Sequence, residues 1–207
     1  MTREISESSS DLHELRLETV LRTLLETGAA SVLDLGCGPG ELLSRLVTEE
    51  KFKKIVGIDT SQEALTAARH LLGLKAGDSK EPRLLLYQAS FTTFVEELVG
   101  FDAAVMVETI EHVEPNRLSA VEQAVFAGYC PKTVLVTTPN REYNVLHGLP
   151  KGALRHQGHR FEWTRTKFSN WAQGVALRNG YRVAFEDIGP ADPVLGSSTQ
   201  MAKFDRT

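Results

Sequence analysis

A chain of 207 residues, 42% hydrophobic and 24% charged, has the length and composition of one folded domain with a full α/β core. A net charge of −4 excludes a protein coated with positive charge for nucleic acid, and two distant cysteines exclude a disulfide framework or a zinc pattern. No apolar run approaches a membrane span and the first residues lack a signal-peptide core, so we expect a cytoplasmic protein without membrane contact.

Helical and extended segments alternate along the chain. An apolar stripe at helical spacing predicts a packing helix that begins near Ser10 and Asp11 and ends at Gly28. Extended runs predict strands at residues 31–35, 54–58, 83–87, 101–107, 133–137, 181–187 and 199–204. Periodic segments between them predict helices at residues 41–48, 61–72, 116–127 and 165–178. This order predicts a three-layer α/β fold whose mostly parallel, seven-stranded sheet is covered by helices on both faces, with residues 1–207 as one domain and residues 1–10 disordered.

Glycines and polar residues follow the carboxyl ends of several predicted strands. The run Gly36-Cys37-Gly38-Pro39-Gly40 lets the backbone approach a ligand, although its third glycine comes one residue earlier than in the dinucleotide fingerprint. Asp59 stands 23 residues after Gly36, where its carboxylate can accept hydrogen bonds from both hydroxyls of a ribose. Because ligands of such sheets bind beyond the carboxyl ends of the strands, residues 34–40, Asp59, Ser90 and residues 108–112 should line one crevice.

The run at residues 107–112 carries the most unusual chemistry. Glu108, Glu111 and His112 are spaced i, i+3, i+4, which on one helical turn would place their side chains on a shared face. Two carboxylates and an imidazole are costly to bring together and desolvate unless a cation lies between them, and a divalent metal is the simplest such cation. A solvated helix face is the alternative, but a position after a sheet strand favours ligation. Another ligand should come from elsewhere, and His156 and His159 are the candidates.

Residues 141–167 form a basic stretch in an acidic chain. They contain six Lys or Arg, two acidic residues and three histidines. Such a stretch can steer a short anionic substrate, and a solvated loop with scattered charge is the alternative.

The segments 33–40 and 57–59 together resemble the class I S-adenosylmethionine-dependent methyltransferases. The resemblance implies a Rossmann-like fold and S-adenosylmethionine as the methyl donor, with Asp34 and Gly36 near its methionine portion and Asp59 on its ribose. Ser90 stands where many members have an acidic residue for the adenine, and Cys37 is expected to be packed. The implied cofactor-binding residues are Asp34, Gly36, Gly38, Asp59 and Ser90.

Three further motifs, at residues 107–112, 138–144 and 159–164, together resemble the RNA 3′-terminal ribose 2′-O-methyltransferases. That family acts on plant small RNAs, animal piwi-interacting RNAs and, in bacteria, RNA ends under repair. The resemblance covers residues 32–189 and implies that residues 138–164 form an inserted segment that binds the metal and RNA. The implied catalytic and metal-binding residues, for Mn²⁺ or Mg²⁺, are Glu108, Glu111, His112 and His159. His159 is preferred to His156 because it begins the His-Arg-Phe-Glu-Trp match, which leaves His156 for RNA contacts.

The implied reaction is methylation of the 2′-hydroxyl of the terminal ribose. A metal bound to the 2′- and 3′-oxygens of that ribose would lower the pKa of the 2′-hydroxyl. The expected substrate-binding residues are Arg141, Tyr143, Arg155 and Arg160, whereas Phe161 and Trp163 are expected to pack beneath the loop. Bacterial relatives imply an RNA-repair role beside a polynucleotide kinase-phosphatase. The alternatives are a small-molecule O-methyltransferase, like those of quinone biosynthesis, and a non-catalytic subunit that binds RNA ends.

Overall fold

The computed structural model describes residues 9–74 and 83–207, and its centre is a seven-stranded sheet in the order β3-β2-β1-β4-β5-β7-β6. Strands β3, β2, β1, β4 and β5 run parallel, and β7 is antiparallel to both β5 and β6. The strands are β1 (Ser31–Leu35), β2 (Lys54–Asp59), β3 (Leu84–Gln88), β4 (Ala103–Val107), β5 (Thr133–Pro139), β6 (Tyr181–Ile188) and β7 (Thr199–Arg206). The prediction of a mostly parallel, seven-stranded sheet is confirmed.

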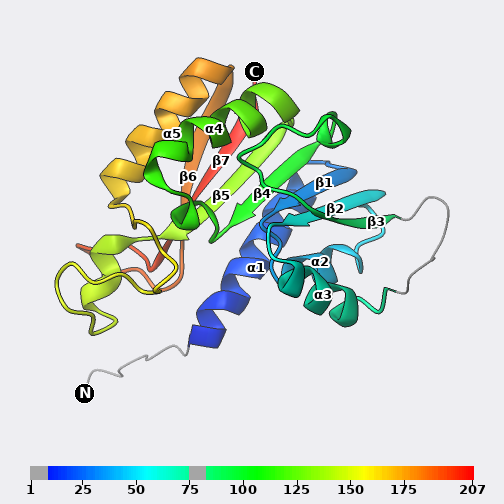
Figure 1. Cartoon of the computed structure of the whole chain (residues 1–207). Coiled ribbons are helices and arrows are strands. Elements are labelled where there is room, and N and C mark those ends of the chain that lie inside the picture. Colours follow the sequence, from blue (N-terminus) through cyan, green and yellow to red (C-terminus); the bar gives the residue numbers. More distant parts are fainter. Residues whose placement is uncertain (1–8, 75–82) are drawn as a thin grey trace.

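Helices cover both faces of the sheet, as the sequence predicts (Figure 1). One face is covered by α1 (Ser9–Glu26), α2 (Glu41–Leu46) and α3 (Gln62–Leu71), and the other by α4 (Leu118–Val121), η4 (Glu122–Tyr129) and α5 (Arg165–Asn179). Each strand of a sheet sends alternate side chains to opposite faces. Leu33 therefore packs in one hydrophobic core, on the α5 side, and Val32 in the other, on the α1 side.

The N-terminal prediction is tested only in part. Residues 1–8, which include most of the segment expected to be disordered, lie outside the described residues, and residues 9 and 10 belong to α1. The helix therefore begins slightly earlier than the predicted cap at Ser10 and Asp11.

The predicted helix at residues 116–127 has a different internal geometry. It consists of the short 3₁₀ turn η3 (Pro115–Arg117), the single α-turn α4, and η4, which is a π-helix. The π-helix buries Val125, Phe126 and Tyr129 on the sheet and ends at Cys130, whose φ of 52° is left-handed. The apolar spacing did not indicate this, because π-helices are rare and occur mostly as short stretches within α-helices.

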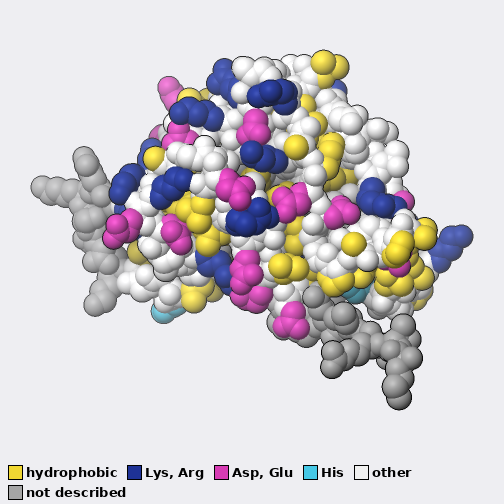
Figure 2. Space-filling view, turned by 180° about the vertical axis from the view of Figure 1, so that it is seen from behind, with side chains coloured by type: hydrophobic (Ala, Val, Ile, Leu, Met, Phe, Trp, Pro, Cys, Tyr) yellow, Lys and Arg dark blue, Asp and Glu magenta, His cyan; other side chains and the backbone are white. Residues whose placement is uncertain are grey.

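The surface seen from behind the view of Figure 1 carries Lys and Arg interspersed with Asp and Glu (Figure 2). This agrees with the exclusion of a uniformly positive protein. Among residues 9–74 and 83–207, none of the helices has both the length and the apolar character needed to cross a bilayer.

Candidate active site

A cavity of about 660 Å³ opens at the carboxyl ends of β1, β2 and β4. The donor-side residues that line it include Asp34, Gly36, Gly38, Asp59 and Ser90. Glu108, His112 and Arg160 line the same cavity. The structure thus joins the predicted donor and acceptor residues in one crevice, because all of these segments follow the carboxyl ends of parallel strands.

The glycine loop lies directly against the segment that follows β4. Gly36 has a φ of 86°, and a Cβ atom placed on it would lie 2.5 Å from Cγ2 of Thr109. The Gly38 N–H donates to Oδ2 of Asp59 over 2.9 Å, and the Ser61 N–H donates to Oδ1 over 2.8 Å. Since a carboxylate offers about four lone-pair sites, Asp59 can still accept two ribose hydroxyls.

Asp34 is a buried carboxylate whose Oδ2 has no hydrogen-bond partner among the described residues. Burial, reinforced by the negative charge of Asp59, raises the pKa of Asp34 to about 7. An unpartnered carboxylate oxygen in the wall of a cavity is suited to a cationic ligand group. The ammonium group of the methionine portion of S-adenosylmethionine therefore fits here.

Helix α1 does more than pack, which corrects the sequence-based interpretation. His13 and Leu17 line the cavity, and Nε2 of His13 lies 2.5 Å from Oε2 of Glu41. Arg16 is also nearly buried, and its Nη2 lies 3.4 Å from Oε2 of Glu108. The apolar stripe revealed only the core-facing side of this helix, and nothing in the sequence placed its polar side at the cavity.

Glu108 does not share a helical turn with Glu111 and His112, so that part of the prediction is wrong. The turn η2 (Ile110–His112) is a 3₁₀ helix, and Glu108 precedes it with a left-handed φ of 51°. Thr137 holds Glu108 in this uncommon conformation: its Oγ1 donates to Oε1 over 3.0 Å, and its carbonyl accepts from the Glu108 N–H over 3.2 Å.

Glu111 is a fully buried carboxyl group of the site. Its Oε2 accepts a hydrogen bond from Oγ1 of Thr138 over 3.0 Å, while its Oε1 has no hydrogen-bond partner among residues 9–74 and 83–207. Burial, with the negative charge of Glu108, raises the pKa of Glu111 well above its usual value. Oε1 lies 4.0 Å from Nε2 of His159. A cation between these two atoms would give the orphaned oxygen a partner, so the residues fit a metal.

Hydrogen bonds at Nδ1 orient both of the predicted histidine ligands in the same way. Nδ1 of His159 lies 2.6 Å from Oε1 of Glu162, and Nδ1 of His112 lies 3.1 Å from the carbonyl oxygen of Gly158. Both oxygens are acceptors, so each neutral ring carries its proton on Nδ1 and keeps a lone pair on Nε2. A carboxylate or backbone carbonyl that accepts the Nδ1–H in this way is the usual partner of a metal-binding histidine.

Glu162 is a candidate site residue that the sequence patterns did not indicate. It is buried, and it also accepts the N–H of Arg155 over 2.7 Å and Nδ2 of Asn144 over 2.5 Å. Glu162 stands three residues after His159 in the sequence. That spacing alone did not predict a hydrogen bond between its carboxylate and the imidazole.

His156 lies beside the predicted ligands. One ring nitrogen from each of His112, His156 and His159 lies within 4.8 Å of the other two. In the described part of the chain, these three form the one group of His, Cys, Asp or Glu side chains whose spacing would allow them to hold a metal ion. The carboxylates of Glu108 and Glu111 lie outside it. The four predicted ligands are thus neighbours, but they do not form one tight cluster by themselves.

Comparison with known proteins defines the family. A model described as a methyltransferase domain matches residues 33–127. The small RNA 2′-O-methyltransferase of Mus musculus is 36% identical over 183 residues, which are 84% of this chain and 46% of that protein. The crystal structure of the methyltransferase domain of bacterial CtHen1-CN is 41% identical with a TM-score of 0.83, over 94% of this chain and 99% of that one. The chain belongs to the Hen1 methyltransferase-domain family.

The Hen1-type domain described here spans about half of the mouse relative. Its fold, that of S-adenosylmethionine-dependent methyltransferases, also matches a Pnkp1/Rnl/Hen1 RNA repair complex, with a TM-score of 0.70 at 19% identity over 95% of this chain and 42% of that one.

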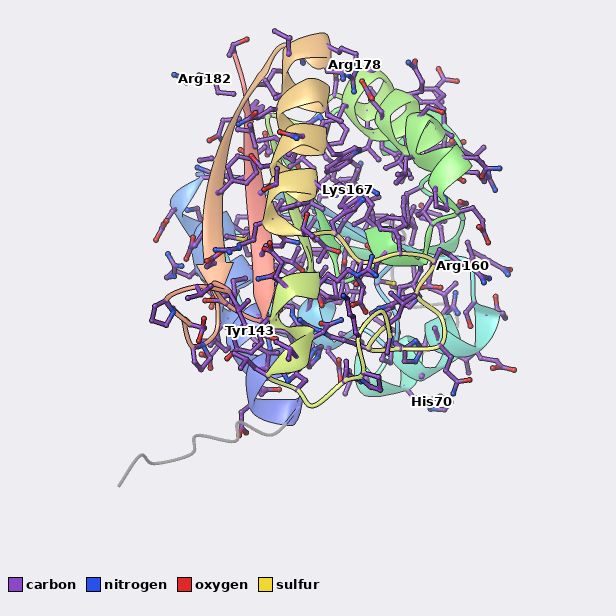
Figure 3. All side chains as sticks on the ribbon, turned by 90° about the vertical axis from the view of Figure 1, so that its left-hand side faces the viewer. His70, Tyr143, Arg160, Lys167, Arg178 and Arg182 are labelled. Atoms are coloured by element: carbon purple, nitrogen blue, oxygen red, sulfur yellow. The ribbon has the colours of Figure 1, made fainter. Side chains whose placement is uncertain are left out.

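Within residues 138–164 of this Hen1-type domain, the residues expected to bind substrate have different surroundings from one another. Tyr143 lies on η5 (Arg141–Val145) and Arg160 on the following loop, away from Arg178 at the far end of α5 (Figure 3). Arg141 is exposed, and Nε of Arg160 lies 2.9 Å from Oε1 of Glu114.

Most N–H groups of the Arg155 guanidinium are hydrogen-bonded within the chain. Its guanidinium donates four hydrogen bonds, to Oδ1 of Asn144, to the carbonyl and hydroxyl oxygens of Ser198 and to the carbonyl oxygen of Asn140. A guanidinium has five N–H groups, which leaves one for another ligand.

Two packing predictions are confirmed, one within residues 138–164 and one in the glycine loop. Trp163 is 3% exposed and its ring lies 4.5 Å from that of Phe161. Cys37 is buried beside the donor loop.

Proposed function

We propose that this domain transfers the methyl group of S-adenosylmethionine to the 2′-hydroxyl of the 3′-terminal ribose of RNA. The single observation that carries the proposal is the arrangement at Glu111: a buried, unpartnered carboxylate oxygen faces Nε2 of His159, next to a cavity that also holds the donor residues. The identity to small RNA 2′-O-methyltransferases supports the same acceptor.

The metal part of the proposal assigns Mn²⁺ or Mg²⁺ to Glu108, Glu111, His112 and His159. Two carboxylates and two imidazoles form a donor set that suits Mn²⁺ in particular. When bound, the metal would supply the Lewis acidity that lowers the pKa of a ribose hydroxyl. The protein residues hold this donor set in place: Glu162 and the Gly158 carbonyl keep Nε2 of His159 and of His112 unprotonated, and Arg16 and Thr137 fix the carboxylate of Glu108.

On the donor side, we assign Asp34 to the ammonium group of the cofactor, Asp59 to its ribose hydroxyls, and Gly36 and Gly38 to close backbone approach. Ser90 is proposed to face the adenine, with its Oγ 2.7 Å from Oγ1 of Thr92. These roles place the sulfonium methyl group in the cavity that Glu108 and His112 also line.

On the acceptor side, we assign Arg141 and Arg160 to RNA phosphates and Tyr143 to a terminal base. Arg155 would use its remaining N–H or exchange one of its internal partners. The contacts are few, as suits a substrate recognised at its end. We further propose a role in bacterial RNA repair beside a kinase-phosphatase, supported by the 41% identity to a bacterial Hen1 domain.

A methyl-transfer assay tests this proposal. Purified protein, tritiated S-adenosylmethionine and a short RNA are incubated with and without Mn²⁺, and the RNA ends in a 2′,3′-diol, a 3′-phosphate or a 2′-deoxyribose. We expect Mn²⁺-dependent transfer to the diol alone. The Glu111→Gln variant should lose transfer, whereas Glu63→Gln, which changes an exposed carboxylate on α3, should retain it. Transfer to a catechol and none to RNA would refute the RNA assignment.

A further inference from the structure

Gly158 contacts two of the three clustered histidines through its backbone. Its carbonyl oxygen lies 3.1 Å from Nδ1 of His112, and its N–H donates to Nδ1 of His156 over 3.0 Å. One residue thus presents an acceptor to one ring and a donor to the other.

These two hydrogen bonds fix opposite tautomers. Because a carbonyl can only accept, Nδ1 of His112 carries the proton and its Nε2 keeps a lone pair. Because an N–H can only donate, Nδ1 of His156 keeps the lone pair, and in the neutral ring the proton is on Nε2. His159 has the same tautomer as His112, since its Nδ1 faces the carboxylate of Glu162.

The opposite tautomer removes His156 from the metal donor set. A ring nitrogen that carries a proton cannot bind a cation, and the other nitrogen of His156 is occupied by the Gly158 N–H. Distance alone would have included His156 in the metal donor set, since one ring nitrogen from each of the three histidines lies within 4.8 Å of the others.

The Nε2–H of His156 is free to reach a ligand. His156 is exposed, and within residues 9–74 and 83–207 its Nε2 makes no hydrogen bond. Its ring centroid lies 5.7 Å from that of His112, which lines the cavity. His156 thus neighbours a residue of the cavity wall, close to the metal position and the RNA terminus of the proposed function.

We propose that His156 is a substrate-binding residue whose Nε2–H donates a hydrogen bond to an oxygen of the RNA terminus, and that it is not a metal ligand. The RNA part of this inference rests on the proposed function. The tautomer and the exclusion from the metal site rest on the contacts of Gly158 alone.

The tautomers are measured directly by long-range ¹H–¹⁵N correlation NMR of the metal-free full chain at a pH where the histidines are neutral. We expect a proton on Nε2 of His156 and on Nδ1 of His112 and His159. A proton on Nδ1 of His156 would overturn the inference.

Metal binding provides a second readout that needs no turnover. Mn²⁺ affinity, measured by electron paramagnetic resonance, should stay within about twofold of the wild type in His156→Ala and His70→Ala, and fall about tenfold or more in His112→Ala. His70 is an exposed histidine on α3 and serves as the matched control. An equal loss of affinity in His156→Ala and His112→Ala would show that His156 is a ligand.

The RNA contact is tested by restoring the donor. The KM for a short RNA ending in a 2′,3′-diol should rise about 3- to 10-fold in His156→Ala with little change in kcat, as expected for one lost hydrogen bond. His156→Gln should restore most of the loss, because its amide nitrogen lies near the position of Nε2, whereas His156→Asn places an amide near Nδ1 and should not. An unchanged KM in His156→Ala would refute the contact. If the wild type itself fails to methylate RNA, the proposed function is wrong, and the NMR and metal readouts still decide the tautomer and the ligand set.

Discussion

The Glu162→Gln substitution tests whether a buried carboxylate orients a metal-binding histidine. Glu162 accepts hydrogen bonds from Nδ1 of His159, the N–H of Arg155 and Nδ2 of Asn144. Burial by itself raises the pKa of Glu162, but these hydrogen bonds outweigh it and hold the pKa below its usual value, so this group is ionised near neutral pH. Glutamine keeps the shape of the side chain but has only one oxygen.

Either orientation of the new amide is unfavourable. If its oxygen replaces Oε1, the NH₂ group meets Nδ2 of Asn144, which is also a donor. If its NH₂ group replaces Oε1, it meets the N–H of Arg155 and forces the His159 proton from Nδ1 to Nε2, which removes the lone pair needed for the metal. The loss of one charge-assisted hydrogen bond costs about 1.5–3 kcal/mol.

We therefore expect Mn²⁺ affinity to fall about 10- to 100-fold in Glu162→Gln. Isothermal titration calorimetry measures the affinity, and thermal unfolding of the metal-free chain reports the accompanying loss of stability. Glu142→Gln is the matched control, because Glu142 lies in the same segment but pairs with Arg165 over 2.7 Å. A lower unfolding temperature with unchanged Mn²⁺ affinity would mean that Glu162 only stabilises the loop, and the reasoning would be refuted.

Three further outcomes follow from the donor site and the core. Because the pKa of Asp34 is about 7 and its ionised form attracts the cofactor ammonium, affinity for S-adenosylmethionine should fall up to about tenfold for each unit of pH below that value. Calorimetry across this range checks it, and a flat profile would contradict the role of Asp34. Gly36→Ala should abolish cofactor binding, since the added Cβ would lie 2.5 Å from Cγ2 of Thr109 and the φ of this residue is positive. If the variant binds the cofactor as the wild type does, the backbone at Gly36 does not need to approach the cofactor closely. Trp163→Ala should lower the free energy of unfolding by about 3–5 kcal/mol in denaturant titrations, and a change below about 1 kcal/mol would show that its ring is not part of the core.

The sequence predicted the architecture correctly, and it placed the candidate donor residues at the cavity that the structure contains. Apolar alternation at residues such as Val32 and Leu33 is a local property of each strand, and the order of strands and helices then leaves few possible topologies. Gly36, Gly38 and Asp59 could be placed at the cavity for the same reason: each stands at or just after the carboxyl end of a predicted strand.

The sequence did not determine which groups meet across the site. Periodicity placed Glu108 on a helical turn, but a left-handed backbone supported by Thr137 turns it toward Arg16 of α1. The distances in sequence are 29 and 92 residues, and no local pattern encodes such contacts.

The difference between His156 and His159 is the clearest example of what only the tertiary structure decided. The two residues are three positions apart, and either could bind a metal on composition alone. Their hydrogen-bond partners at Nδ1, a backbone N–H of Gly158 for one and the carboxylate of Glu162 for the other, give them opposite tautomers. A tautomer is set by the partner that folding brings to the ring. The motif at residues 159–164 favoured His159 as the ligand, but only the folded chain shows the hydrogen bonds that give the two rings opposite tautomers.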